Sequence, residues 1–286
     1  LVDRALAQAS YRDDVIRLDR RQAEFVKPIW TYLDTAVSDT RVRNGRRALR
    51  RHRAVLARIE DRYGVPAEVV TAIWGLESAY GTYRGDIPLV SSLATLAHDG
   101  RRGRFFEAQL IAALRILDSG AVSLAQFQGS WAGASGHTQF IPTSYLAHAV
   151  DFDGDGRRNI WSDDPTDALA SAANYLAQAG WTTGLPWGVE VRLPDGFDYQ
   201  QAGRSIRKPT RDWAALGLRA AQGSLPPMPQ ASVLVPAGAA GAAFLISSNF
   251  AVIERYNTAD AYVIAVGHLA DRIAGGPPLQ AGWPRQ

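Results

Sequence analysis

The stretch between Pro66 and Gly81 constrains the fold most, because it carries a start signal, an apolar row and a stop signal for one helix. Proline suits the first turn of a helix, where its missing N–H is not needed, and glycine suits the C-terminal end. Four apolar residues recur at helical spacing between these two signals: Val69, Ile73, Leu76 and Tyr80. The pattern predicts an amphipathic helix that packs one face against a core.

Glu77 lies at the edge of that apolar face, one turn from the expected end of the helix. Partial burial and the negative end of the helix dipole both disfavour an ionised carboxylate, so both raise its pKa. A general acid that works near neutral pH needs such a raised pKa. The alternative is an ordinary surface or capping glutamate, and only motifs elsewhere in the chain decide between the two.

Composition narrows the class of protein. The chain has 286 residues, of which 47% are hydrophobic, so it can bury a large core. The formal charge of +3 is a mild excess that does not indicate a dedicated nucleic-acid binder. Cysteine is absent, which excludes disulfides, thiolate metal sites and a cysteine nucleophile. No run approaches the roughly 20 apolar residues of a membrane-spanning helix.

The patterns predict a mainly α (α+β) protein in five parts. Helical periodicity dominates up to about residue 185 and returns after residue 248. Short alternating segments such as Val189–Leu193 lie between them and favour strands. The predicted parts are an N-terminal α region (1–60), a core (61–185), a small β-containing subdomain (186–248), a helical return (249–274) and a proline-rich tail (275–286).

The segment 129–145 is too rich in glycine for a regular element, yet too aromatic and apolar for a disordered loop. Its small residues allow the backbone to approach a ligand closely. Ser130 and Gln139 are uncharged hydrogen-bonding residues, so they suit a neutral ligand rich in hydroxyl and amide groups better than a phosphate.

The next segment, 151–161, has the spacing of a calcium-binding loop. Asp151, Asp153 and Asp155 stand at loop positions one, three and five, followed by a glycine at position six. Hard oxygen ligands at alternate positions are what calcium needs. Ser162 replaces the usual closing glutamate, and Asp163, Asp164 or Asp167 are the candidates to supply the missing ligand. An acidic turn without a metal is the alternative.

Three further groups are candidate binding residues. A third helix is expected to begin at Arg101 and run to Leu117, with an apolar row on one face. Arg101 and Arg102 lie near its start, where the dipole disfavours cations, which indicates either a function or pairing with Asp99 or Glu107. Tyr32 stands with Trp30 in an aromatic patch that either stacks on sugars or fills a core. Separately, Tyr256, Asn257 and Tyr262 bring two phenols and an amide close together, as sugar-binding or packing residues.

Taken in order, these motifs resemble the bacterial lytic murein transglycosylases of the MltB and soluble lytic transglycosylase B type. The resemblance rests on Gly-Leu-Glu77-Ser-Ala-Tyr-Gly, Arg101-Arg102 before Phe-Phe, Gly-Ser130 through Gln139-Phe-Ile-Pro, Asp-Phe-Asp-Gly-Asp-Gly, and Arg-Tyr256-Asn257 followed by Tyr262. It implies a lysozyme-like helical core with an additional α-domain, a small β-domain and a groove for a glycan strand.

The resemblance assigns roles to residues of this chain. Glu77 corresponds to the single catalytic glutamate of the family. The implied groove residues are Tyr32, Arg101, Arg102, Ser130, Gln139, Tyr256, Asn257 and Tyr262. Asp167 corresponds to the aspartate that closes the family's atypical EF-hand, within the loop 151–167. This chain has Ser135 where the family often has methionine, which would retune a sugar subsite without touching the chemistry.

The implied reaction cleaves the β-1,4 bond between N-acetylmuramic acid and N-acetylglucosamine without water and leaves a 1,6-anhydro end. No cofactor is expected for catalysis, and a structural Ca²⁺ is the only metal expected. Peptidoglycan strands are the expected partner, and the periplasm is the location that this substrate implies. The alternatives are a hydrolytic muramidase on the same scaffold, a non-catalytic peptidoglycan-binding module, and a calcium-binding regulatory protein.

Overall fold

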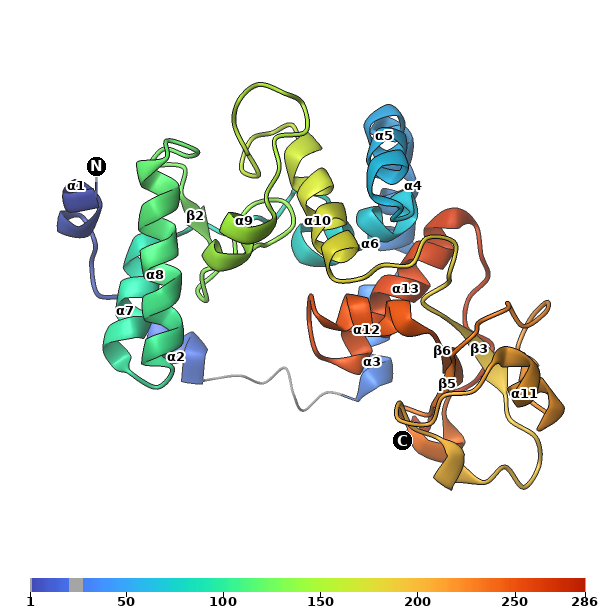
Figure 1. Ribbon diagram of the computed structural model, residues 1–286. Coiled ribbons are helices and arrows are strands. Elements are labelled where there is room, and N and C mark those ends of the chain that lie inside the picture. The colour runs from blue at the N-terminus through green and yellow to red at the C-terminus, as the bar shows by residue number, and fades with distance from the viewer. Residues whose placement is uncertain (1, 21–27, 286) are drawn as a thin grey trace. The chain divides into compact units, whose positions relative to one another are not determined.

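The computed structural model describes residues 2–20 and 28–285 and is predominantly helical (Figure 1). These residues form thirteen α-helices and two small antiparallel sheets. Within the described ranges, no helix has both the length and the apolar character needed to cross a bilayer. The mainly helical class with a small β-containing part, predicted from the sequence, is confirmed.

The chain forms two compact units. The first contains residues 2–20, Arg47–Tyr63 and Ile73–Tyr175, and the second contains Pro28–Arg46, Gly64–Ala72 and 176–285. The chain passes from one unit to the other inside α4 (Asp39–Arg51), inside α6 (Ala67–Ser78) and near the end of α10 (Thr166–Gln178). The boundaries at 60, 185, 248 and 274 stay predictions.

The first unit is built around a helical pair. The centre of the unit is α7 (Leu89–Asp99) packed along α8 (Gly103–Asp118), side by side in Figure 1. A two-stranded sheet pairs β1 (Ile87–Pro88) with β2 (Gln128–Gly129). The other helices are α1 (Val2–Ala7), α2 (Asp13–Arg20), α5 (Arg53–Tyr63), α9 (Pro142–His148) and α10 (Thr166–Gln178).

The apolar row expected on the third helix is buried where α8 packs. Phe106, Ala113 and Leu117 are at most 1% exposed, and Leu110 is half-buried. The helix begins at Gly103 rather than at Arg101, because the backbone of Arg102 is not helical (φ −129°, ψ 40°). Both arginines therefore stand just before the first turn of α8.

The second unit combines four helices with a four-stranded sheet. Its helices are α3 (Ile29–Ala36), α11 (Thr210–Ala215), α12 (Ser248–Glu254) and α13 (Asp260–Ala274). The sheet has the order β4-β3-β6-β5, with β3 (Gly188–Arg192), β4 (Arg219–Ala220), β5 (Ser232–Leu234) and β6 (Ala243–Ile246). Every strand of this sheet falls within residues 186–248.

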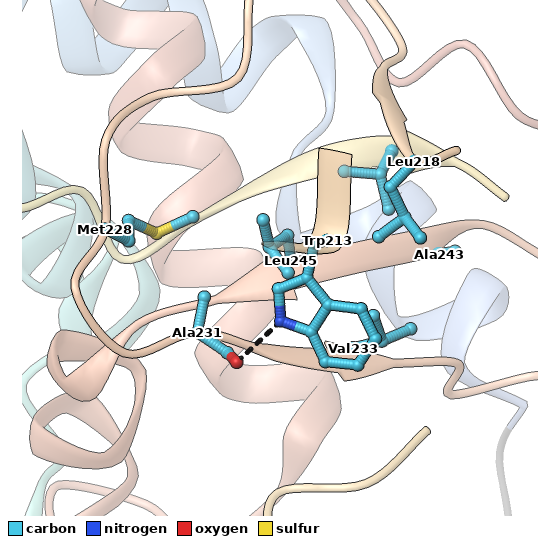
Figure 2. Packing of buried hydrophobic residues seen from close by; sticks show 8 residues of the cluster. Trp213, Leu218, Met228, Ala231, Val233, Ala243 and Leu245 are labelled. Carbon is cyan, nitrogen blue, oxygen red and sulfur yellow. Dashed lines mark hydrogen bonds between the residues drawn. The ribbon is translucent and has the colours of Figure 1, made fainter. Parts of the chain in front are cut away.

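The sheet of the second unit has its own apolar core (Figure 2). Trp213 of α11 is fully buried there against Val233 and Leu245, and its indole N–H donates to the carbonyl oxygen of Ala231 over 2.9 Å. A buried tryptophan needs such an acceptor, because an unpaired indole N–H would be costly. The strands of this sheet are short, so the packing of their side chains contributes much of what holds the sheet together.

Candidate active site

Glu77 is the penultimate residue of α6. The helix ends at Ser78, two residues earlier than the apolar row suggests, because Ala79 and Tyr80 adopt left-handed backbone angles (φ 48° and 60°). Non-glycine residues rarely adopt such angles, and they cluster at sites where the surroundings enforce them. Glu77 itself is half-buried, as the sequence predicts.

The residue after Glu77 is tied to the glycine-rich loop through His137. The hydroxyl of Ser78 donates to the carbonyl oxygen of His137 over 2.6 Å, and the indole N–H of Trp74 donates to Nδ1 of the same histidine over 3.2 Å. Nε2 of His137 lies 2.7 Å from the carbonyl oxygen of Ser162, so Nε2 carries the proton and donates.

The electrostatics of His137 agree with this arrangement. The side chain is only 4% exposed, and burial lowers its pKa. The imidazole is therefore neutral near pH 7, with Nδ1 as acceptor and Nε2 as donor. A neutral ring of fixed tautomer therefore holds the end of α6 against the loop through hydrogen bonds and carries no charge.

Two glycines of the Glu77 motif are required by close contacts. A Cβ at Gly75 would lie 2.6 Å from the Tyr80 ring, and a Cβ at Gly81 would lie 2.5 Å from Nδ1 of His137. Gly81 also has a φ of +85°, which favours glycine. The glycines at positions 75 and 81 are therefore needed because the turn after Glu77 packs closely against Trp74 and His137.

Gln139 is held in the same loop by its own backbone and amide. Its φ is +52°, and its Nε2 donates to the carbonyl oxygens of Arg84 (3.1 Å) and Gly136 (2.9 Å). Both amide protons are thus used within the protein. The carbonyl oxygen of the half-buried side chain remains as an acceptor for an N–H or O–H of a ligand.

Ser130 lies at the start of the same loop. Its backbone N–H donates to the carbonyl oxygen of Ala134 over 2.7 Å, and its hydroxyl oxygen accepts the N–H of Ala134 over 3.1 Å. The hydroxyl proton is then left to donate outward from a half-buried position. Ser130 and Gln139 together offer one donor and one acceptor, which suits an amide or a sugar hydroxyl.

Arg101 and Arg102 pair with a residue that the sequence does not single out. Both donate to Asp19 near the end of α2, whereas Asp99 pairs with Arg20 over 2.9 Å. The expectation of pairing with Asp99 or Glu107 is therefore wrong for Asp99. An acidic residue in the last turn of a helix, where the dipole disfavours it, is the signal that could have pointed to Asp19.

The remaining groove candidates belong to the second unit. Tyr256 and Asn257 lie in the turn between α12 and α13, and Tyr262 follows in the first turn of α13, where it is 5% exposed. The amide oxygen of Asn257 accepts the N–H of Ala259 over 3.0 Å, which fixes this turn before α13 starts. Tyr32 is half-buried on α3, a helix that packs against α13.

The acidic loop brings Asp151, Asp153 and Asp155 together. Each offers a carboxylate oxygen, and these three oxygens lie within 4.8 Å of one another. Asp167 holds the backbone of the loop: one of its carboxylate oxygens accepts the N–H of Phe152 and the other accepts the N–H of Asn159, each over 2.8 Å. Burial raises the pKa of Asp167, which is 3% exposed. Three exposed hard oxygen donors on a preformed turn fit Ca²⁺.

Comparison with known proteins places the chain in a family. The model of the transglycosylase SLT domain matches residues 1–271. The chain belongs to this family. Membrane-bound lytic murein transglycosylase B of Escherichia coli (strain K12) is 34% identical over 285 residues, which cover 94% of this chain and 76% of that protein.

Solved structures of family members match the whole fold. SltB3 from Pseudomonas aeruginosa, crystallised with NAG-anhNAM-pentapeptide, is 50% identical, with a TM-score of 0.94 over 99% of this chain and 76% of that one. The Escherichia coli lytic transglycosylase Slt35, solved with calcium, is 32% identical, with a TM-score of 0.80 over 95% of this chain and 86% of that one. The predicted family, enzyme class and lysozyme-like fold are thereby confirmed.

The family motifs hold together through residues that sequence reasoning missed. Ser78 and His137 are part of the quoted motifs, but the sequence does not show that they contact each other. Their hydrogen bond links two motifs across 59 residues of the chain. Arg84 is a third such residue, since its guanidinium donates to the carbonyl oxygens of Trp161 and Ser162, each over 2.8 Å. It thereby joins the segment between α6 and β1 to the acidic loop 151–167.

Proposed function

We propose that this chain cleaves the β-1,4 bond between N-acetylmuramic acid and N-acetylglucosamine of peptidoglycan by transglycosylation, with Glu77 as the only catalytic carboxylate. The observation that carries this proposal is the position of Glu77. It is half-buried at the end of α6, where the turn that follows is interlocked with the Gln139 loop. Ordinary glycosidases place two carboxylates across the bond, and the motifs around Glu77 offer one.

Glu77 acts first as acid and then as base. It protonates the bridging oxygen, and the N-acetyl group of the substrate stabilises the cation that develops at C1. Glu77 then takes the proton of the muramyl C6 hydroxyl, whose oxygen closes onto C1. The product carries a 1,6-anhydro ring, and no water is consumed. Partial burial supports both steps, since it favours the protonated acid and excludes water as a competing nucleophile.

The polar residues of the loop bind the uncharged parts of the sugar. The Gln139 carbonyl oxygen accepts from an amide or hydroxyl, and the Ser130 hydroxyl donates to a carbonyl such as that of an N-acetyl group. Arg101 and Arg102 bind an anionic part of the substrate. On the second unit, Tyr32, Tyr256, Asn257 and Tyr262 supply aromatic and amide contacts to further sugars.

The acidic loop binds one structural Ca²⁺. Asp151, Asp153 and Asp155 would hold the ion, and Asp167, which already organises the loop backbone, would close the site. The calcium complex of Slt35, a relative of the same fold, supports this assignment. The ion takes no part in the chemistry and stabilises the loop that follows the Gln139 segment in the sequence.

Digestion of purified peptidoglycan followed by mass spectrometry of the released muropeptides tests the proposal. Products lighter by one water than hydrolytic products are expected, and Glu77→Gln should lower turnover by roughly 10²–10⁴-fold. Asp118→Asn, which removes an exposed carboxylate at the end of α8, is the control. Hydrated products would make the protein a muramidase, and equal activity of the Glu77→Gln protein would sink the assignment of Glu77. We expect the enzyme to act in the periplasm, because its proposed substrate is peptidoglycan.

A further inference from the structure

A cavity of the second unit lies along one face of α13. Its volume is about 470 Å³, which falls within the range of small-molecule binding sites. Four segments of the same unit line it: residues 186–190 at the start of β3, residues between 221 and 226, the C-terminal half of α13, and residues 276–279. No described residue assigned to the glycan groove is among them.

His268 is a buried polar residue that lines the cavity and has no bond of its own. Its side chain is 7% exposed, and its ring has no hydrogen-bond partner among the described residues. Such groups are rare, because a polar atom that leaves water without a new partner costs free energy. Burial lowers the pKa of His268 to about 4, so the ring is neutral near pH 7 and one of its nitrogens is an acceptor. The cavity therefore offers this acceptor to a ligand that donates.

Asp271 lies one turn further along α13, on the same face of the helix. Its Oδ2 accepts the indole N–H of Trp187 over 3.0 Å, whereas Oδ1 has no hydrogen-bond partner within the described ranges. Trp187 is itself fixed, because its ring packs where Gly267 has no side chain: a Cβ there would lie 2.2 Å from the ring. The next residue, Arg272, pairs with Asp39 over 3.6 Å. Asp271 thus keeps one oxygen for a ligand.

The cavity is acidic, although the whole chain has a formal charge of +3. Asp271 and Glu190 are its carboxylates, and no lysine or arginine lines it in the part of the chain that the structure describes. Glu190 is already used by the backbone, since its carboxylate accepts the N–H groups of Gln280 and Ala281. The charge of Asp271 is then the one that a bound cation can neutralise.

The other walls of the cavity are apolar and preformed. Trp187, Pro226, Ala274, Pro277, Pro278 and Leu279 supply carbon surface. The tail that carries three of these residues is fastened on both sides. The N–H of Gly276 donates to the carbonyl oxygen of Asp271 over 2.8 Å, and Gln280 is bonded to Glu190. Calcium or magnesium needs about six oxygen ligands, which such walls do not supply. An ammonium group on an aliphatic chain matches both the carboxylate and the carbon surface.

We propose that this cavity binds a primary ammonium group on an unbranched aliphatic chain, as in a lysine-like side chain or a free diamine. The ammonium has three donors: one bonds Oδ1 of Asp271 and another bonds the unprotonated nitrogen of His268. The aliphatic chain lies against Trp187 and the prolines, and the indole ring also favours a nearby cation. The site is separate from the proposed glycan groove and does not depend on the proposed function.

Calorimetric titration with Nα-acetyl-lysine amide tests the site, and Nα-acetyl-norleucine amide is the matched ligand without the charge. The lysine compound should bind with a Kd of about 1 mM, as a ligand of this size allows. The norleucine compound should bind at least about tenfold more weakly, because it leaves Asp271 unpaired. Equal affinities would overturn the proposal. Cadaverine distinguishes the sources: a free diamine is the ligand if cadaverine binds more tightly than the lysine compound, and a peptide side chain if it binds less tightly.

Variants of the two α13 residues locate the binding. Asp271→Asn keeps the shape of the side chain and removes its charge, so it should weaken binding of the lysine compound at least about tenfold. His268→Phe removes the acceptor and should weaken binding about three- to tenfold. Asp195→Asn is the control, since Asp195 is exposed after β3 and does not line the cavity. Unchanged binding by Asp271→Asn would contradict the proposal. Competition by Ca²⁺ or Mg²⁺ that this variant loses would make the cavity a metal site instead.

The indole resonance of Trp187 keeps the test decisive if Asp271→Asn folds poorly. The Trp187 N–H donates to Asp271, so its ¹H–¹⁵N cross-peak in the wild-type protein should shift as the lysine compound is added. Trp187→Phe assigns this peak by its disappearance. The Trp213 cross-peak is the internal control, because that indole N–H donates to Ala231 inside the sheet core and should not move. A Trp187 peak that stays in place at saturating ligand would overturn the proposal.

Discussion

The hydroxyl of Ser78 donates to the carbonyl oxygen of His137 over 2.6 Å, so the residue next to Glu77 is fixed to the loop that carries Gln139. The Ser78 oxygen also accepts the N–H of Gly81 over 3.0 Å, which closes the turn after the helix. One hydroxyl thus joins the helix end, the turn and the loop.

Gly81→Ala should destabilise the protein by more than its backbone strain alone. A Cβ at this position would lie 2.5 Å from Nδ1 of His137, so the imidazole must shift and weaken its bonds to Trp74 and Ser162. Overpacking of this kind costs about 1–3 kcal/mol. Gly120→Ala is the matched control, because its φ is +73° and a Cβ there would meet nothing within 4 Å. Urea unfolding should give a larger loss for Gly81→Ala, and equal losses would contradict the contact.

Gln139→Ala should lower kcat/KM by about ten- to a thousandfold and leave the fold intact. The substitution removes the acceptor oxygen offered to the substrate and the two bonds to Arg84 and Gly136. The measurement is the initial rate of muropeptide release, with thermal unfolding recorded alongside. Gln128→Ala serves as control, since Gln128 is exposed at the start of β2. An unchanged rate would remove Gln139 from the site.

Calcium should raise the melting temperature without changing kcat. A ligand that binds only the folded state stabilises it by about 2.7 kcal/mol at a hundredfold excess over Kd. Asp151→Asn should abolish this response, because it removes one of the three clustered carboxylates. Asp118→Asn, at the exposed end of α8, should leave it unchanged. If the wild-type melting temperature ignores calcium and chelator alike, the loop is an acidic turn without a metal.

His268 should make the protein less stable in acid. Burial lowers the pKa of this α13 histidine to about 4, whereas an unfolded chain keeps it near 6.5. The unfolded state therefore binds more protons between these values, and stability is lost as pH falls through this window, by about 3 kcal/mol at most. His268→Gln should flatten this dependence relative to the wild type in urea unfolding at pH 7, 6, 5 and 4.

Asp271, one turn further along α13, changes the stability of the protein with pH in the opposite direction. The pH dependence must therefore be compared between the wild type and His268→Gln. Burial raises the pKa of Asp271 to about 6, so the folded state takes up this proton first and gains stability as pH falls below 6. The difference between wild type and His268→Gln cancels this contribution, because both proteins contain Asp271. Parallel pH profiles for the two proteins would show that His268 is not the group that titrates.

Much of the fold could be predicted because local signals and tertiary packing agree. The helix that starts after Pro66 (α6) and the strand predicted at Val189–Leu193 (β3) form where the sequence pattern places them. Helix ends were less predictable: α6 stops at Ser78, although Tyr80 continues its apolar row. The Tyr80 ring packs on Gly75 instead, and this contact with the body of α6 has no signature in the spacing of apolar residues.

The sequence by itself determined which residues are candidates for the chemistry, because a glutamate at a helix end, a polar glycine-rich loop and alternating aspartates are each local patterns. Only the tertiary structure decided how they are held. In the structure, His137 connects two motifs through hydrogen bonds. Asp19 pairs with Arg101, which is 82 positions away in the sequence. Hydrogen bonds and ion pairs form only over a few ångströms. Residues far apart in the chain come that close only when the helices pack.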